Sequence, residues 1–283
     1  MERQLTTLAA ATFVLVFSRL CGAEEIGFRL ARKHFVIVPV LVNGQGPYEF
    51  LLDTGSTTSV VERELGADLG LKPLQETVIR TATGTEGVPI ARVHQIDVGS
   101  QSARTVLVLC SEMDGVRSLD ENIRGILGFN FLSRLRYTLD YKRKKLRFEG
   151  DGAIEGTRIP FDPSGRSIIL SAGHLRLLLD TGATGIFLFH ADGLDIEMDA
   201  RSIRSVSTLS GRRVAKSGLL RRLVIGDETL HRVPITLVPQ SELEERADGL
   251  VPGTLFDSFY VDHEAGFVVL NPREGGQRGP TQP

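Results

Sequence analysis

The sequence has no tryptophan, two cysteines and three methionines among its 283 residues. Cys21 falls in the N-terminal segment, so an exported chain that loses this segment keeps Cys110 alone and has no internal disulfide. Stability then has to come from packing, for which a content of 41% hydrophobic residues suffices. Cys110 follows the apolar segment 105–109, and we expect a small buried side chain there rather than a nucleophile.

An excess of charge of one sign is also missing, because 33 basic residues stand against 35 acidic ones. Nucleic acids and anionic membranes usually require a strongly basic face, so we predict neither as a partner. The basic run 142–145 is interpreted as the solvated tip of a hairpin. The six histidines lack metal-ligand spacing such as His-Glu-x-x-His, so we predict no metal and no cofactor.

No apolar run is long enough to cross a membrane comfortably. The uncharged stretch 4–18 has 15 residues between Arg3 and Arg19, whereas a spanning helix needs about 20. Its length fits the apolar region of a signal peptide, and the small residues before Glu24 suit cleavage after Ala23. We therefore predict a signal peptide at 1–23 and a periplasmic or secreted protein with no stable membrane span after cleavage. An uncleaved N-terminal anchor remains the alternative.

The sequence does contain a long internal repeat. The segment 50–56, which reads Phe-Leu-Leu-Asp-Thr-Gly-Ser, returns at 177–183 as Leu-Leu-Leu-Asp-Thr-Gly-Ala. Counted from Asp53 and Asp180, glycines follow at offset 31 (Gly84, Gly211), at offset 46 (Gly99, Gly226) and at offsets 75 and 73 (Gly128, Gly253). Chance would rarely keep three such landmarks in step, so the spacing indicates an internal duplication.

Both halves consist of short apolar runs separated by turn residues, which predicts an all-β fold. An apolar run at 35–42, the turn 43–47 and a second run at 48–52 predict a hairpin that leads into Asp53. We expect one amphipathic helix, at 59–71. The predicted organisation is an N-terminal lobe at 24–150, a linker at 151–158, a C-terminal lobe at 159–273 and a disordered tail at 274–283.

Two Asp-Thr-Gly motifs, each followed by a glycine-tipped hairpin and an apolar-apolar-Gly element, resemble the bilobal aspartic proteases. The first half is most similar to the bacterial retropepsin-like family, through segments 38–44, 50–56 and 125–132. The resemblance covers 35–148 well and 167–271 more loosely. It implies two similar pepsin/retropepsin-like β-barrel lobes with the active cleft between them. It also implies a protein or peptide substrate and a site completed within one monomer.

The chemistry of peptide hydrolysis explains why two carboxylates are needed. One carboxylate activates a water molecule while a second acid protonates or polarises the substrate carbonyl group. Two carboxylates about 3 Å apart do not both ionise easily, so they share one proton. We predict Asp53 and Asp180 as this catalytic dyad. Which of them is ionised first is a property of the pair and is not assigned by the sequence.

The residues that follow each aspartate have roles implied by the resemblance. Thr54 and Thr181 are expected to cross-link the two active loops by hydrogen bonds. Gly55 and Gly182 are expected to let backbone N–H groups approach the carboxylates, because a side chain there would block them.

The fourth residue of each motif predicts unequal surroundings for the two carboxylates. The Ser56 hydroxyl is expected to form a hydrogen bond with Asp53. Ala183 has no hydroxyl and offers Asp180 no such bond.

Two glycine-tipped hairpins are interpreted as flaps that close over an extended peptide and exclude water. Their predicted substrate-binding residues are Thr83, Gly84, Thr85, Ser210 and Gly211. The first flap lacks the tyrosine of pepsin-like enzymes, the second apolar-apolar-Gly element contains Pro252, and segment 185–195 lacks a helical pattern. These departures leave open a second lobe that supports the fold but binds substrate differently.

Two functions remain at this point. The first is an exported single-chain aspartic endopeptidase. The second is a non-catalytic module on the same fold that captures an extended peptide by strand addition. Retention of the aspartate, threonine and glycine of both motifs favours the peptidase.

Overall fold

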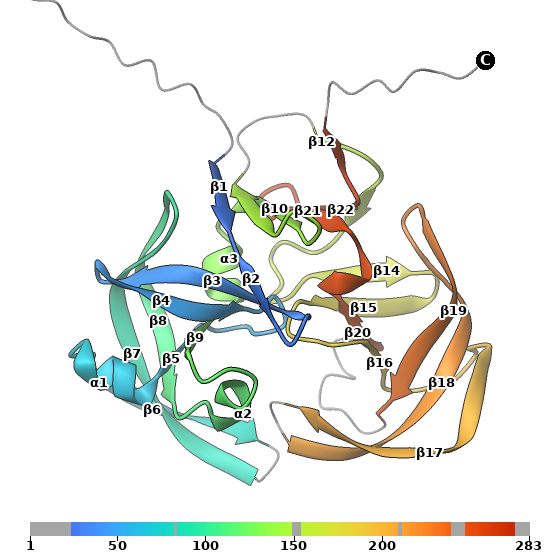
Figure 1. Cartoon of the computed structure of the whole chain (residues 1–283), viewed down its shortest axis with the longest axis horizontal. Coiled ribbons are helices and arrows are strands. Elements are labelled where there is room, and N and C mark those ends of the chain that lie inside the picture. The colour runs from blue at the N-terminus through green and yellow to red at the C-terminus, as the bar shows by residue number, and fades with distance from the viewer. Residues whose placement is uncertain (1–23, 82–83, 149–153, 209–210, 239–246, 275–283) are drawn as a thin grey trace, which may run out of the picture.

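The computed structural model describes residues 24–81, 84–148, 154–208, 211–238 and 247–274. The chain is almost entirely β and forms two lobes side by side, which a shared sheet joins at one end (Figure 1). The predicted all-β, two-lobed fold is therefore confirmed. The predicted signal peptide at 1–23 lies outside the described residues.

The first lobe is built on an eight-stranded sheet. Its strands, in spatial order, are β2 (Arg29–Ala31), β3 (Phe35–Val42), β4 (Gln45–Leu52), β9 (Ile123–Leu127), β5 (Val60–Glu62), β8 (Gln101–Ser111), β7 (Gly84–Val98) and β6 (Pro73–Thr81). Three short helices accompany it, α1 (Arg63–Asp68), α2 (Asp114–Arg117) and α3 (Phe129–Leu132). The hairpin expected to lead into Asp53 is formed by β3 and β4.

The second lobe repeats this topology in a seven-stranded sheet. Its strands, in spatial order, are β14 (Ile169–Ala172), β15 (Leu175–Asp180), β20 (Gly249–Pro252), β16 (Ile186–Leu188), β19 (Glu228–Leu237), β18 (Gly211–Ile225) and β17 (Ile196–Thr208). The parallel pair β15–β20 corresponds to β4–β9, and the parallel pair β16–β19 corresponds to β5–β8. The same strand order in both lobes confirms the duplication inferred from the glycine spacing.

A six-stranded sheet connects the two lobes. Its strands, in spatial order, are β1 (Glu24–Gly27), β11 (Lys145–Phe148), β10 (Arg136–Asp140), β21 (Ser258–Asp262), β22 (Phe267–Leu270) and β13 (Arg158–Pro160). The antiparallel pair β10–β21 joins the last hairpin of the first half to the last hairpin of the second. The relative position of the lobes is therefore set by backbone hydrogen bonds as well as by side-chain packing.

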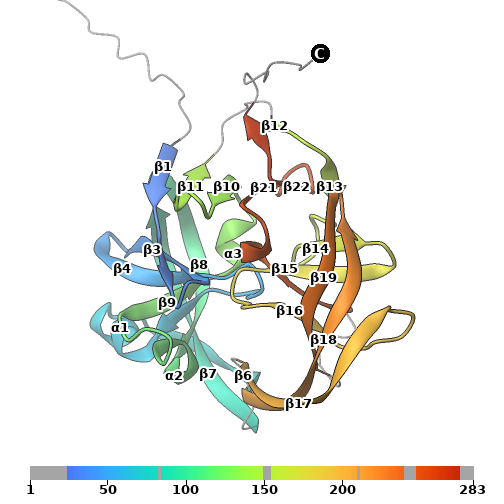
Figure 2. The same cartoon turned by 45° about the vertical axis from the view of Figure 1, so that its right-hand side comes forward.

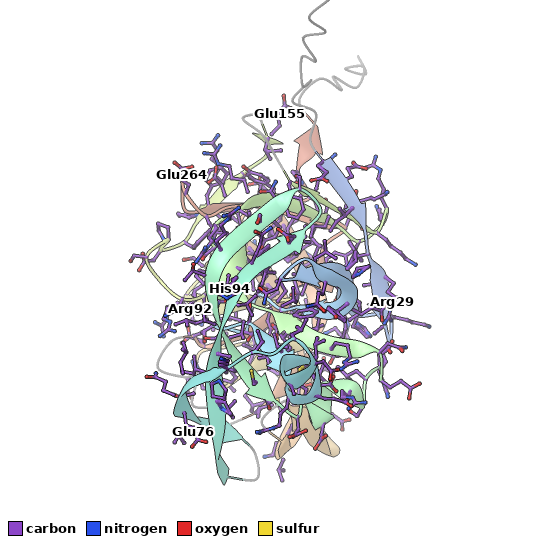
Figure 3. The ribbon with its side chains drawn as sticks, turned by 90° about the vertical axis from the view of Figure 1, so that its left-hand side faces the viewer. Arg29, Glu76, Arg92, His94, Glu155 and Glu264 are labelled. Atoms are coloured by element: carbon purple, nitrogen blue, oxygen red, sulfur yellow. The ribbon has the colours of Figure 1, made fainter. Side chains whose placement is uncertain are left out.

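The long strands have the period of two that a sheet with one buried face requires. In β7, Ala91 and Val93 are buried, whereas Arg92 and His94 are exposed on the outer face of the first lobe (Figure 3). Cys110 on β8 is a free, buried cysteine, as expected from its apolar surroundings. Within the described residues, no helix is long and apolar enough to span a membrane.

Some boundaries differ from those predicted. The helix expected at 59–71 is shorter, because residues 60–62 form β5 and pair with both β8 and β9 before α1 begins. Tertiary pairing of the two valines in β5 outweighs the helical pattern there. Ile154–Glu155 of the predicted linker form β12, which pairs with β23 (Arg273–Glu274). This pairing also includes Glu274, the first residue of the predicted disordered tail.

Candidate active site

Asp53 and Asp180 occupy equivalent positions at the ends of two strands. Asp53 directly follows β4, and Asp180 is the last residue of β15. The backbone N–H of Asp53 donates to the carbonyl of Leu127 at 3.0 Å, while Asp180 lies opposite Pro252 in the parallel pair β15–β20. Each aspartate is thus fixed by the apolar strand of its own lobe, and both strands end between the lobes (Figure 2).

The two loops are cross-linked by their threonines. The Thr181 hydroxyl accepts from the Thr54 N–H at 3.0 Å and donates to the Leu52 carbonyl at 2.7 Å. In return, the Thr54 hydroxyl accepts from the Thr181 N–H at 3.1 Å and donates to the Leu179 carbonyl at 2.6 Å. Both threonines are buried. The expected hydrogen bonds between the loops are therefore present, and they are reciprocal.

The glycines bring the two carboxylates together. A Cβ added to Gly55 would lie 2.7 Å from Oδ1 of Asp180, and one added to Gly182 would lie 3.0 Å from both carboxylate oxygens of Asp53. These distances are shorter than ordinary side-chain contacts, so each glycine makes room for the aspartate of the other lobe. The sequence predicted that these glycines let backbone N–H groups approach the carboxylates, and it did not predict the space for the carboxylate of the other lobe.

Backbone donors do reach each carboxylate from its own loop. Gly55 and Ser56 donate N–H bonds to Oδ1 of Asp53 at 2.9 and 3.2 Å, and Gly182 donates to Oδ1 of Asp180 at 2.7 Å. The predicted bond from the Ser56 hydroxyl to Asp53 is absent, because that hydroxyl donates to the Thr58 carbonyl at 2.9 Å. Ser56 therefore contributes its backbone rather than its side chain.

Burial raises the pKa of both carboxyl groups, but unequally. Burial raises the pKa of Asp53, while the N–H of Gly55 and a hydrogen bond from Asp180 favour its charged form. Burial and the adjacent charge of Asp53 hold the pKa of Asp180 well above its usual range. The burial of both carboxyl groups and the adjacent charge of Asp53 therefore disfavour a state in which both are ionised.

Sequence reasoning did not predict a polar cluster behind the Asp53 loop. The Ser59 hydroxyl donates to the Asn130 side-chain oxygen at 2.7 Å and accepts from the Gly128 N–H at 3.0 Å. The Asn130 amide then donates to the Leu107 carbonyl at 2.8 Å. The available signal was an asparagine between two phenylalanines in the motif at 125–132.

The predicted flaps correspond to two long hairpins, β6–β7 and β17–β18, which extend toward the same end of the molecule (Figures 1 and 2). Gly84 and Thr85 begin β7, and Gly211 begins β18, whereas Thr83 and Ser210 lie outside the described residues. Beside the Asp180 loop, a cavity of about 660 Å³ opens in the second lobe. It is lined by residues 184–187, by 197–199 on β17, by 217–219 on β18 and by 234–236 on β19.

Comparisons with known proteins identify the family through one family model. No curated protein shows significant similarity to the chain. A crystal structure of a retropepsin-like aspartic protease from Rickettsia conorii is similar over 45% of this chain and 91% of its own, with 18% identity and a TM-score of 0.35. The family model described as aspartyl protease matches residues 38–131 and 170–253. These two segments make up more than half of the chain and each contains one Asp-Thr-Gly motif, so the chain belongs to the aspartyl protease family and is a peptidase.

Proposed function

We propose that the chain is an endopeptidase in which Asp53 and Asp180 share one proton and activate the hydrolytic water. The observation that carries this proposal is the approach of each loop glycine to the carboxylate of the other lobe. The reciprocal threonine bonds support it, because they hold both loops in one geometry. A pair of buried carboxylates that share a proton has the acid and the base that uncatalysed amide hydrolysis lacks.

The proposed reaction begins with Asp53 ionised and Asp180 protonated. Asp53 takes a proton from water as the water oxygen attacks the carbonyl carbon, and Asp180 gives its proton to the carbonyl oxygen. The tetrahedral intermediate then returns a hydroxyl proton to Asp180, while Asp53 protonates the amide nitrogen and the C–N bond breaks. Each carboxyl group ends in its starting state, and neither a metal nor a covalent intermediate is required.

The proposed substrate is an extended peptide that lies between the two flap hairpins. The cavity beside residue 184 supports binding of substrate side chains by the second lobe. Met198, a large apolar residue that is 38% exposed, is part of its lining, so a substrate side chain in this cavity would cover apolar surface. Sequencing of cleavage products from a peptide library tests this, since the Met198→Ala variant should change the preferred side chain.

The catalytic proposal is tested by cleavage of a denatured protein across a pH series, with and without an inhibitor that mimics the tetrahedral intermediate. Asp53→Asn and Asp180→Asn should each abolish cleavage. Asp195→Asn is the matched control, because Asp195 is an exposed partner of Arg221 on the surface. If the wild type cleaves nothing while both site variants bind peptide as well as it does, the protein is instead the peptide-binding module.

We also propose that one chain forms the whole site and that the protein is exported. The pairing of β10 with β21 brings both halves together without a second subunit. Specific activity should then be independent of protein concentration, and light scattering should report a monomer of the mature mass. N-terminal sequencing of the protein from fractionated cells tests export. A chain that starts at Glu24 supports signal cleavage, and one that retains the N-terminal segment in the membrane fraction supports the anchor.

A further inference from the structure

The two aspartate loops are supported from behind in different ways. The first rests on the polar cluster in which Ser59 bridges Gly128 and Asn130. In the second half, the residue six positions after the aspartate is Ile186 rather than serine, and the strand register places Thr254 where the first half has Asn130. Because Ile186 has no hydroxyl group, the second half has no counterpart of the Ser59–Asn130 bond behind Asp180.

Tyr141, which comes from the other half of the chain, lies behind the second loop. It directly follows β10, and its N–H donates to the Asp257 carbonyl at 2.9 Å. A Cβ added to Gly253 would overlap the Tyr141 hydroxyl oxygen and would lie 3.1 Å from Cγ2 of Thr181. The phenol thus lies beneath the glycine that packs against the Asp180-Thr181 loop.

Apolar contacts hold the Tyr141 ring in this place. Its centroid lies 6.1 Å from that of Phe28 and 6.3 Å from that of Phe259. The hydroxyl oxygen is buried and has no hydrogen-bond partner among the described residues. Burial is the main cause of the raised pKa of Tyr141, and the nearby Tyr137 and the charge of Asp180 raise it further.

We propose that Tyr141 is a positioning residue for Asp180, which fixes the loop of the C-terminal half from the N-terminal half by lying beneath Gly253. This inference rests on the proposed dyad. The ring, rather than the unpartnered hydroxyl, carries the role, because it fills the space and excludes water from the back of the loop. Among the described residues, Asp53 is the charged side chain that raises the pKa of Asp180, and the charge of Asp180 in turn contributes to the raised pKa of Tyr141.

A matched control is available in the same sheet. Tyr137 on β10 is also buried, also has a hydroxyl without a hydrogen-bond partner among the described residues, and also lies against Phe259, at 6.5 Å. The tyrosine that would meet a Cβ at Gly253, however, is Tyr141. Tyr141→Leu and Tyr137→Leu should therefore both lower the melting temperature, but they should differ in catalysis.

We expect Tyr141→Leu to lower kcat about tenfold with KM unchanged, since a displaced catalytic group loses rate rather than substrate binding. Water would then reach the back of Asp180, so the alkaline limb of the kcat profile should move to lower pH. Tyr141→Phe should restore both properties to wild-type values. Tyr137→Leu, assayed below its melting temperature, should keep the wild-type kcat and pH profile.

A second pair of variants tests the contact directly and does not depend on the stability of Tyr141→Leu. Gly253→Ala should impair activity, and adding Tyr141→Phe should partly restore it by removing the atom that the new methyl group overlaps. Adding Tyr137→Phe should restore nothing. Equal behaviour of the Tyr137 and Tyr141 variants in both experiments overturns the positioning role while the dyad stands. An active Asp180→Asn variant overturns the dyad and the positioning role together.

Discussion

Gly55 of the first lobe lies against the carboxylate of Asp180 in the second, at a place where a Cβ would be 2.7 Å from Oδ1. The approach of Gly182 to Asp53 mirrors this contact at 3.0 Å. Neither glycine has a positive φ angle, so conformational freedom of the backbone is not what requires glycine here. Glycine is required because the carboxylate of the other lobe occupies the space of a side chain.

Substituting these glycines should therefore affect catalysis more than folding. We expect Gly55→Ala to lower kcat about 100-fold, because the methyl group displaces a carboxylate whose position sets the rate. Gly182→Ala should lower kcat less, because its added Cβ would lie farther from the opposite carboxylate. Gly27→Ala is the control, since a Cβ there has nothing within 4 Å. Steady-state kinetics with thermal unfolding measure both effects, and loss of fold without selective loss of kcat would contradict the expectation.

The threonine cross-link should contribute to stability as well as to geometry. Thr54→Val leaves the buried Leu179 carbonyl and the Thr181 N–H without their partners, at a cost of about 1–3 kcal/mol for each unsatisfied group. We expect a lower free energy of unfolding in urea and a lower kcat. Thr54→Ser keeps the hydroxyl and should recover most of both. A serine variant as weak as the valine variant would show that the methyl group matters instead.

Asp180 should make the folded protein less stable as the pH rises. Its folded-state pKa is raised, so the stability it contributes is present below the ordinary carboxyl range and is lost as the pH rises through the raised value. Asp180→Asn removes this loss. Its melting temperature should exceed that of the wild type at neutral pH, and the difference should shrink toward pH 4. A constant difference across this range would argue against a raised pKa.

His263 should make the folded protein less stable as the pH falls, which is the opposite dependence. Its ring lies among Phe129, Tyr137 and Phe161, and burial lowers its pKa to about 4, while Asp262 opposes the shift. A lowered histidine pKa gives stability that is present above about 6.5 and lost as the pH falls toward 4, by about 3 kcal/mol in total.

The variant His263→Leu tests this expectation. Neither ring nitrogen of His263 has a hydrogen-bond partner among the described residues, so the substitution leaves no polar group unpaired. We expect the variant to keep its stability between pH 6.5 and 4, as measured by urea unfolding at each pH. The nearby salt bridges of Arg136 with Asp262 and Glu264 remain unchanged. A variant that loses stability as steeply as the wild type would contradict the assignment.

The duplicated features of this protein could be predicted from the sequence because the two copies of the repeat can be compared with each other. The equivalence of Asp53 and Asp180 followed from glycine spacing, and the strand order of the lobes agrees with it. Features that lie outside the repeat were not predicted. No repeated pattern points to Tyr141, because its contact with Gly253 joins the two halves. The bond between Ser59 and Asn130 joins residues that are 71 positions apart in the sequence.

The Ser56 hydroxyl shows a different limit. A serine near an aspartate suggests a bond between their side chains, but the Ser56 hydroxyl donates to the Thr58 carbonyl, two residues further on. Which of the two acceptors the hydroxyl binds depends on the side-chain rotamer of Ser56, and the sequence pattern does not indicate this rotamer. Similarly, residues 60–62 have a helical pattern, yet neighbouring strands on both sides draw them into the sheet.

The pairing of β10 with β21 has the register of a two-fold axis. Asp140 and Asp262 are equivalent residues, since each accepts an N–H bond from the third residue after it, at 2.8 and 2.9 Å. Arg136 lies opposite Asp262 while Ser258 lies opposite Asp140, so the pairing is symmetric about Thr138 and Tyr260. Two copies of a single half would use the same self-complementary contact, as isologous dimers do. Two halves within one chain can differ in sequence, whereas the two subunits of a homodimer cannot. One such difference is the salt bridge between Arg136 and Asp262, since the symmetry-related pair is Ser258 and Asp140.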